Sequence, residues 1–260
     1  MSTSPPVLVS KQEQVAVITL NRPDNANTLD IPTGRALLEA AIDCERDTAV
    51  RAIVLTGAGK NFCFGGDLRG MVAAGSSREG YLRELTSYLH GAISHFVRMD
   101  APVIAAINGT AAGAGIGLAL MADLAIAAQS AKFSLAYTGV ALTPDGSTSF
   151  FLPRMVGPRR AAELILTNRN LSAQEACDWG MINQVVATDK VLDEAKALAT
   201  RLAAGPIRAY GKSKRLLAAS SGALEAHMAL ESQMIARQAS TSEGHEGIGA
   251  FLEKRQPKFN

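Results

Sequence analysis

The chain has 260 residues, of which 47% are hydrophobic and 19% are charged, and its formal net charge is +2. This balance is typical of a soluble globular protein with a sizeable core, and it excludes the strong positive field that attracts nucleic acid. We expect no membrane span, because the apolar runs are short, and no secretory leader, because the first residues lack a basic region followed by an apolar one. We also expect no zinc or disulfide framework, because Cys44, Cys63 and Cys177 lie far apart. We therefore expect a cytoplasmic protein.

The first part of the chain alternates predicted strands and helices. Val15–Leu20 is short, apolar and β-branched and precedes the turn NRPDN, which predicts a strand. Thr33–Cys44 carries apolar residues at helical spacing, and Ala52–Leu55 predicts a second, buried strand. Residues 57–66 are rich in glycine and predict a loop. Arg78–Met99 then predicts a long helix, which ends before a proline.

The same alternation continues from Val103. Val103–Ile107 predicts a third strand, followed by a Gly/Ala-rich turn and a helix over Gly115–Met121. Leu124–Ala128 and Lys132–Leu135 predict two further strands. Helices are predicted, in order, over Pro158–Thr167, Ser172–Trp179, Asp189–Ala204, 206–219, 223–239 and 243–254. Strands alternating with helices, followed by helices alone, indicate an α/β layered core with a C-terminal helical region.

Two glycine-rich loops follow these strands. Gly113-Ala-Gly115-Ile-Gly117 opens a helix, but the dinucleotide-binding fingerprint fails because its sixth position is Leu118. Gly59-Lys60 resembles the end of a phosphate-binding P-loop, but the leading glycine and the Ser/Thr of that motif are absent. One remaining interpretation is that these glycines serve tight packing alone.

A second interpretation of the loops is chemical. A helix that starts after residues 112–114 leaves its first backbone N–H groups without partners and carries partial positive charge. The loop at residues 62–66 is placed to direct another N–H group at the same point. Two such donors would stabilise an enolate-like oxygen. Spacing alone leaves both interpretations open.

Five stretches, which together cover nearly the whole chain, resemble the crotonase, or enoyl-CoA hydratase/isomerase, superfamily. They are VAVITLNRPDNANTLD (15–30), AIVLTGAGKNFCFGGDL (52–68), APVIAAINGTAAGAGIGLALMADLAIA (101–127), LPRMVGPRRAAELILTNRNLSAQEACDWGMINQVV (152–186) and GIGAFLEKRQPKF (247–259). The resemblance implies a crotonase-like (ClpP/crotonase) α/β spiral of stacked ββα units over residues 1–200. It also implies a C-terminal helical region over residues 201–260 that trimerises the chain and completes the CoA site.

The resemblance further implies partners and site residues. The expected partners are an acyl-CoA thioester and further copies of the chain, in a homotrimer or a hexamer; no metal or redox cofactor is implied, since CoA is part of the substrate. The backbone N–H groups of Phe64 and Ala114 match the family's oxyanion donors. Contacts with CoA or substrate are implied for Arg22, Asn25, Ala26, Phe62, Gly66, Asp67 and Leu68, with Arg69 near the phosphates. Phe251 and Lys254 match positions that reach the CoA of a neighbouring chain.

Two positions depart from the pattern of the family's hydratases, which handle water with a pair of glutamates. Gly117 and Tyr137 occupy those positions here, so neither supplies a carboxylate. The usual route for activating water is therefore missing, which argues against an ordinary hydratase. We expect Tyr137 to shape the pocket instead.

Asp145, in the stretch ALTPDGSTS, is the remaining acid–base candidate. An aspartate after proline is common in turns, where its side chain caps backbone N–H groups. Some family members with a similar segment use this aspartate as the sole acid and base, which takes a proton from C2 of a 3-enoyl-CoA and returns it at C4. The isomerase of phenylacetate catabolism, which acts on a ring-epoxide thioester, is similar in this stretch. We expect an apolar pocket to raise the pKa of this carboxyl and make it a better base; the predicted pocket residues are Val140, Leu142, Phe150 and Phe151.

A second resemblance is to the 4-chlorobenzoyl-CoA dehalogenase branch of the superfamily. There an aspartate attacks the aromatic ring and a histidine assists hydrolysis, and Asp145 and His90 match those positions. That branch has a pocket tryptophan where this chain has Tyr137, and an asparagine where it has Pro144, which weakens the interpretation. His90 is therefore also a candidate substrate contact, although it has an ordinary structural interpretation as well.

The principal hypothesis from the sequence is an enoyl-CoA isomerase in which Asp145 relays the proton while Phe64 and Ala114 hold the thioester oxygen. The alternatives are a dehalogenase-like hydrolase, an enoyl-CoA hydratase and a non-catalytic acyl-CoA-binding protein.

Overall fold

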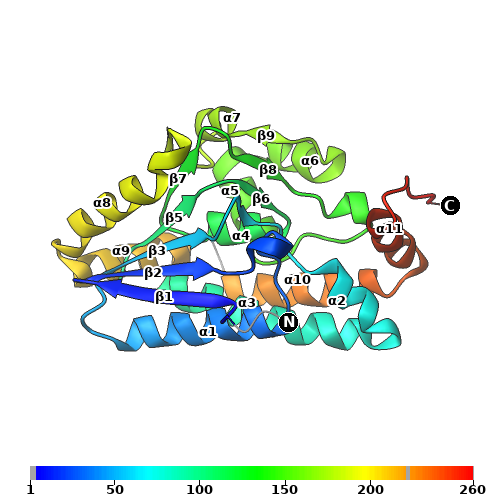
Figure 1. Ribbon diagram of the computed structural model, residues 1–260, viewed down its shortest axis with the longest axis horizontal. Helices are drawn as coiled ribbons and strands as arrows, with labels where there is room; N and C mark the ends of the chain where they lie inside the picture. The colour runs from blue at the N-terminus through cyan, green and yellow to red at the C-terminus, as the bar shows by residue number, and fades with distance from the viewer. Residues whose placement is uncertain (1–3, 221–222, 260) are drawn as a thin grey trace.

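The computed structural model describes residues 4–220 and 223–259, in which two sheets are covered by helices (Figure 1). The larger sheet has the strand order β1 (Val7–Gln12), β2 (Val15–Leu20), β3 (Ala52–Gly57), β5 (Val103–Ile107), β7 (Leu124–Ala128) and β10 (Gln184–Val186). The smaller sheet has the order β4 (Asn61–Cys63), β6 (Thr110–Ala112), β8 (Lys132–Ser134) and β9 (Leu171–Ser172). Neighbouring strands are parallel except at two edges, where β1 pairs with β2 and β9 with β8 antiparallel.

A strand–strand–helix unit repeats along the chain. A strand of the larger sheet is followed by one of the smaller sheet and then by a helix, as in β3–β4–α2 (Leu68–Ala73) and β5–β6–α4 (Ala114–Leu120). Stacking aligns the units, so that Leu55 of β3 stands opposite Ala105 of β5, which in turn pairs with Ala125 of β7. Every residue of β3 and β5 is buried, as expected for parallel strands covered on both faces. This arrangement is the predicted spiral of stacked ββα units.

Helices cover both sides of the larger sheet. The remaining helices are α1 (Ile31–Arg46), α3 (Arg78–Arg98), α5 (Thr148–Val156), α6 (Pro158–Thr167), α7 (Ala173–Asp178), α8 (Val191–Ala203), α9 (Ile207–Ser220), α10 (Leu224–Ala239) and α11 (Ser242–Leu252). Figure 1 shows α1 and α3 side by side below β1–β3, and α8 packs against β3, β5 and β7 on the other side. No helix within the described residues is both long and apolar enough to cross a membrane.

Several predicted elements have the observed bounds, and others were missed. β2, β5, β7 and α6 begin and end where the sequence predicted them. The predicted loop over residues 57–66 was wrong in part, because it contains β4. Also missed were β1, β6, β9, β10, α2 and α5. The division predicted between residues 200 and 201 stays a prediction, although α8 runs across it.

The C-terminal helices pack onto the core where the site lies. α10 packs against α3 and α5, and the Thr86 and Ser232 hydroxyl oxygens, 2.6 Å apart, link α3 to α10. α11 packs against α2, α10 and a short 3-10 turn at Thr138–Val140. Figure 1 shows α11 beside α2, at the end of the molecule away from α8. The C-terminal region therefore contributes side chains to one end of the core.

Candidate active site

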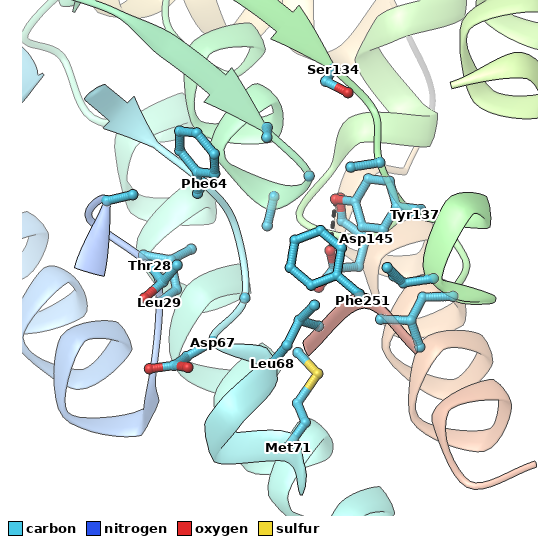
Figure 2. A pocket seen from close by; sticks show the side chains of 18 of the residues that line it. Thr28, Leu29, Phe64, Asp67, Leu68, Met71, Ser134, Tyr137, Asp145 and Phe251 are labelled. Atoms are coloured by element: carbon cyan, nitrogen blue, oxygen red, sulfur yellow. Dashed lines mark hydrogen bonds between the residues drawn. The ribbon is translucent and has the colours of Figure 1, made fainter. Parts of the chain in front are cut away.

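A cavity of about 610 Å³ lies between the loops that follow β2, β4, β6 and β8 and the helices α3, α10 and α11 (Figure 2). The residues that line the cavity fall into a solvent-exposed group and a buried group. The exposed lining residues are mostly polar and include Asp24, Asn25, Arg69, Lys132 and Asn170. Among the described residues that line it and are buried, only Tyr137 and Asp145 carry polar side chains. The cavity therefore suits a ligand with a polar part near solvent and an apolar part inside.

Two backbone loops meet at the start of α4. The Ala114 N–H is the first of this helix, so it has no acceptor within the helix, and no described residue outside it accepts this hydrogen. Gly65, at φ +79°, lies against it, since a Cβ at this position would come within 2.9 Å of the Ala114 nitrogen. Only glycine allows the loop to approach so closely. The structure thus brings the two predicted loops together beside a free N–H group.

The other predicted oxyanion donor, the backbone N–H of Phe64, already has an acceptor within the protein. The Phe64 N–H donates to the carbonyl oxygen of Ala26 at 3.1 Å. Phe64 and Ala114 both line the cavity. A ligand oxygen held by both amides would have to share the Phe64 N–H with Ala26 or replace that carbonyl. The oxyanion role of this pair stays a prediction.

Asp145 is buried in the cavity wall, with a relative exposure of 6%. Its turn packs against α4, because a Cβ on Gly146 would lie 3.4 Å from the Cβ of Ala114. Burial raises the pKa of the Asp145 carboxyl from 3.8 to about 6, while the Tyr137 hydroxyl, which donates to Oδ1 at 2.8 Å, opposes that rise (Figure 2). A buried carboxyl with a raised pKa can accept and return a proton near neutral pH.

The Tyr137 hydrogen bond leads to a pH prediction. Tyr137→Phe removes a donor that favours the charged carboxylate, so we expect the pKa of Asp145 to rise further, by about 1 pH unit. Titration of the labelled Asp145 carboxyl carbon by NMR measures this directly. Tyr88→Phe, at the end of a surface contact with Arg35, is the control and should leave the value unchanged. A lower or unchanged pKa in the Tyr137 variant would contradict the prediction.

Gly117, at the first of the two hydratase glutamate positions, has no room for a side chain. A Cβ there would lie 2.0 Å from the carbonyl oxygen of Gly146, in the turn that follows Asp145. The second position, Tyr137, is filled by a buried ring that contacts the same turn. The Asp145 turn therefore occupies space that a glutamate at residue 117 would need.

We expect Gly117→Ala to destabilise the fold by about 1–3 kcal/mol, because the added methyl group meets backbone rather than a flexible side chain. The midpoint of chemical denaturation measures this. Gly80→Ala is the matched control: Gly80 also lies in a helix, α3, but with nothing within 4 Å of an added Cβ, so this change should be neutral or stabilising. Equal stability of the two variants would show that the Asp145 turn can shift to accommodate the added methyl group at little energetic cost.

Some predicted pocket residues lie elsewhere. Val140 and Leu142 line the cavity, but Phe150 and Phe151 do not; the Phe150 ring packs against Arg154 and His227 instead. The apolar wall comes from α3 and α10, through Leu82, Leu85, Leu89 and Ile235. The reason is that α5 begins directly after the Asp145 turn and carries its aromatic side chains away from the cavity.

His90 is likewise absent from the described residues that line the cavity. Its Nε2 accepts a hydrogen bond from the Gly146 N–H at 3.2 Å, and burial lowers the pKa of the ring to about 4. His90 is therefore a neutral acceptor that supports the Asp145 turn from behind. The substrate contact predicted for it has no support in this geometry.

The sequence profile of the family described as enoyl-CoA hydratase/isomerase matches residues 10–260. The chain belongs to the enoyl-CoA hydratase/isomerase family. It is 36% identical to the 1,2-epoxyphenylacetyl-CoA isomerase of Escherichia coli (strain K12), covering 97% of both chains. It is 42% identical to a probable enoyl-CoA hydratase of Rhodobacter capsulatus, covering 95% of both.

The chain also resembles a relative that is named for a different reaction. A 4-chlorobenzoyl coenzyme A dehalogenase of Arthrobacter sp is 38% identical over 84% of this chain and 80% of its own. Among solved structures, an enoyl-CoA hydratase from Mycobacterium avium subsp. paratuberculosis K-10 has a TM-score of 0.89 at 28% identity, covering 98% of both chains. This likeness confirms the predicted crotonase fold. The relatives are named for different reactions, so likeness to them leaves the reaction of this chain open.

The resemblance to the family implied CoA contacts for a set of residues in this enoyl-CoA hydratase/isomerase family member. These residues form two groups. Those that line the cavity are Asn25, Ala26, Gly66, Asp67, Leu68, Arg69 and Phe251. Phe251 is 58% exposed and lies on the wall of its own chain's cavity, where the resemblance implied contact with a neighbour's CoA (Figure 2). Phe62, Arg22 and Lys254 do not line it; Phe62 is fully buried in the core.

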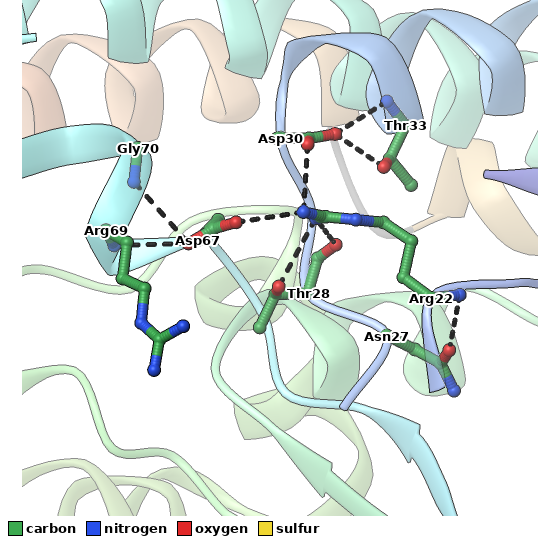
Figure 3. A network of polar contacts seen from close by, with 8 residues as sticks. All are labelled: Arg22, Asn27, Thr28, Asp30, Thr33, Asp67, Arg69 and Gly70. Carbon is green, nitrogen blue, oxygen red and sulfur yellow. Dashed lines mark hydrogen bonds and ion pairs between the residues drawn. The ribbon is translucent and has the colours of Figure 1, made fainter. Parts of the chain in front are cut away.

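Arg22 joins the loops instead of facing the cavity (Figure 3). Its Nη2 lies 3.0 Å from Asp30 and 3.1 Å from Asp67. These carboxylates cap the first turns of α1 and α2, where Asp30 accepts from Thr33 and Asp67 from the N–H groups of residues 69 and 70. Two acidic partners neutralise the guanidinium, so Arg22 stabilises the loops rather than offering a free charge.

Sequence reasoning missed one buried acid next to the site. Glu231 of α10 accepts from the Ser147 N–H at 2.7 Å and the Ser149 N–H at 3.0 Å. The only signal for it was a glutamate on an otherwise apolar helix face, which is weak. Among the described residues, no group of three or more His, Cys, Asp or Glu side chains is placed to hold a metal ion.

Proposed function

We propose that this protein is an enoyl-CoA isomerase that shifts a carbon–carbon double bond with Asp145 as its single acid–base group. The observation that carries the proposal is Asp145, the one buried carboxyl among the described residues that line the cavity, which lies beside the free N–H of Ala114. Gly117 and Tyr137 stand where the resemblance places the hydratase glutamates, and neither supplies a carboxylate. One relative is itself named as an isomerase of a CoA thioester.

The thioester carbonyl is the group that the backbone amides hold. The Ala114 N–H donates to its oxygen, and the Phe64 N–H becomes the second donor when the oxygen shares it with Ala26. Negative charge develops on this oxygen as C2 loses its proton, so both donors bind the transition state more strongly than the substrate. The CoA portion extends toward the exposed polar lining near Asn25 and Arg69.

Asp145 moves the proton. As a carboxylate it takes the proton from C2 of a 3-enoyl-CoA, and the electrons delocalise over the dienolate that forms. The resulting carboxylic acid returns the proton to C4, which leaves a 2-enoyl-CoA and the original carboxylate. A pKa of about 6 suits both steps near neutral pH. No water or cofactor takes part.

The second candidate is a dehalogenase-like hydrolase, which the Arthrobacter relative favours. It would use Asp145 as a nucleophile and His90 as the base for hydrolysis. The His90 Nε2 already accepts from the Gly146 N–H, and this residue does not line the cavity. This weighs against hydrolysis by that route.

A panel of thioesters tests the proposal. We expect 3-hexenoyl-CoA to be converted to its conjugated 2-enoyl isomer, with a rise in ultraviolet absorbance and, in heavy water, little deuterium at C4, because the same buried carboxyl carries the proton from C2. Crotonyl-CoA is the substrate for hydration, and 4-chlorobenzoyl-CoA is the substrate for chloride release. Faster hydration of crotonyl-CoA, or chloride release, would overturn the isomerase assignment. Tight binding of every thioester without turnover would favour a non-catalytic acyl-CoA-binding protein.

We also propose that the chain assembles into a homotrimer or a hexamer through its C-terminal helices. Support comes from large apolar side chains that α9 and α10 leave exposed, namely Leu216, Leu217, Leu230 and Met234. Light scattering coupled to size exclusion measures the mass. A monomer would contradict the proposed assembly without affecting the proposed reaction.

A further inference from the structure

Glu231 is a buried carboxyl that the proposed reaction does not use. It lies on α10 with a relative exposure of 4%, and both of its oxygens are engaged. Oε2 accepts from the Ser147 N–H at 2.7 Å; Oε1 accepts from the Ser149 N–H at 3.0 Å and from the Ser149 hydroxyl. All these donors belong to the segment that directly follows Asp145.

The segment that Glu231 binds is a strained turn. Gly146 and Ser147 both have positive φ, +60° and +65°, and the second is a residue that rarely adopts this conformation. The Ser147 hydroxyl is buried without a hydrogen-bond partner. Such a turn persists only when its surroundings hold it. His90 of α3 holds the Gly146 N–H, and Glu231 holds the next two free N–H groups, at the start of α5.

Glu231 is also electrostatically coupled to Asp145. Burial, together with the negative charge of Asp145, raises the pKa of Glu231 to about 7, and the hydrogen bonds from Ser149 and Ser147 oppose this rise. Of the ionisable groups around it, His227 of α10 has its Nε2 3.6 Å from Oε1; Arg154 of α5 acts electrostatically on His227, and His90 of α3 binds the same turn at Gly146. The negative charge of Asp145 therefore makes the Glu231 carboxyl harder to ionise.

We propose that Glu231 is a positioning residue for Asp145: its ionised carboxylate binds the Ser147 and Ser149 amides and so fixes the turn that holds the Asp145 side chain in the cavity. This inference rests on the proposed function. Its chemistry requires a carboxylate, since glutamine, or a protonated glutamate, can offer only one carbonyl oxygen to two amide donors. The active form of the enzyme is therefore the one in which both carboxyls are ionised.

The cluster of Ser149, His227 and Glu231 is not a hydrolytic triad. In such a triad the acid orients the histidine through the ring nitrogen that does not face the serine. Here Glu231 contacts Ser149 itself, and the His227 Nε2 faces both residues, 2.8 Å from the Ser149 hydroxyl. The geometry fits support of a turn rather than nucleophilic attack by a serine.

Glu231→Gln tests the proposal with 3-hexenoyl-CoA as the substrate. We expect kcat to fall by about tenfold to a hundredfold, because a small displacement of the base is costly, while KM changes little. The sharper readout is the acid limb of log(kcat/KM) against pH. Its limiting slope is expected to approach 2 in the wild type, where two carboxyls must be ionised, and to fall to 1 in the variant.

Two matched variants control for other causes. Ser232→Ala breaks the link from α10 to α3 at the next residue, and should leave both kcat and the slope unchanged. His227→Gln removes the second ionisable side chain, besides Glu231, that contacts Ser149. This variant should keep the wild-type slope near 2, because both carboxyls remain. If Glu231→Gln folds poorly, adding Ser147→Gly relieves the positive-φ strain, and the slope is then measured in the double variant.

The outcomes separate this inference from the proposed function. Loss of activity in Asp145→Asn, together with an unchanged slope and kcat in Glu231→Gln, would overturn the positioning role and leave the isomerase intact. A Glu231→Gln variant whose activity falls only in proportion to its unfolded fraction would do the same. Full isomerase activity in Asp145→Asn would instead remove the proposed function itself.

Discussion

Replacing Asp145 by asparagine is expected to lower kcat for double-bond migration by about 10³–10⁴-fold, since in the proposed mechanism the same group both removes and returns the proton. Binding of the CoA thioester should be nearly unchanged, because asparagine preserves shape and can still accept from the Tyr137 hydroxyl. Steady-state kinetics with 3-hexenoyl-CoA and calorimetric titration with a non-reacting acyl-CoA measure the two quantities. Turnover within tenfold of the wild type would exclude Asp145 as the base.

This variant needs a chemical control. Asparagine before Gly146 creates an Asn–Gly sequence, which deamidates readily and would restore the carboxylate. Intact mass measured before and after the assay detects the conversion, and Asp145→Ala provides a variant that cannot revert in this way. The two variants should share the same loss of activity.

The same substitution is expected to stabilise the fold at neutral and higher pH. Burial raises the pKa of Asp145 from 3.8 to about 6, so the folded state holds a proton that the unfolded chain releases, and stability is lost as the pH rises through this interval. The effect corresponds to about 3 kcal/mol. Asparagine does not ionise, so its advantage in unfolding free energy should be present above pH 6 and absent below about pH 4.

Ala114→Pro is expected to lower kcat by about 10²–10³-fold, because it deletes the one N–H group proposed to hold the thioester oxygen without a competing acceptor. Proline is well tolerated at the first position of a helix, and the preceding Gly113 is the residue least restricted before proline. We therefore expect a folded protein with a specific catalytic defect, measured by kcat and by the denaturation midpoint.

Ala114→Gly is the matched control for this deletion. It keeps the N–H group and removes only a methyl group, so its kcat should stay near that of the wild type. Wild-type turnover by Ala114→Pro would show that this amide does not stabilise the developing charge. A loss of the same size in Ala114→Gly would show that the methyl contact, and not the amide, is responsible.

The interior of the fold was predictable because its strands are buried on both faces. Val103–Ile107 and Leu124–Ala128 are continuous apolar runs, and the observed strands have the same bounds. Edge elements carry no such signal, and β1 buries only its first residue. α5 was missed because it starts after a left-handed Ser147 and contains Pro153, and both features look like a loop in sequence.

The candidate site was predictable where it depends on motifs, and not where it depends on tertiary packing. The stretch around Asp145 and the loop around Gly65 could be recognised locally. The wall formed by Leu82, Leu85 and Leu89 resembles any helix face that packs in a core. Glu231 comes within hydrogen-bonding distance of Ser147, 84 residues away, only because α10 folds back onto the turn. Contacts between residues so far apart along the chain produce no pattern in the local sequence of either segment.

The fit between Gly117 and the carbonyl of Gly146 has a consequence for how reactions diverge in this family. A glutamate introduced at residue 117 meets the main chain before it can approach a substrate, so no single substitution there adds water chemistry to this scaffold. The turn must first move away, and that movement displaces Asp145, the base proposed for the double-bond shift. Evolutionary passage between the two chemistries therefore requires coordinated changes, and intermediates that carry only one of them should be poor at both.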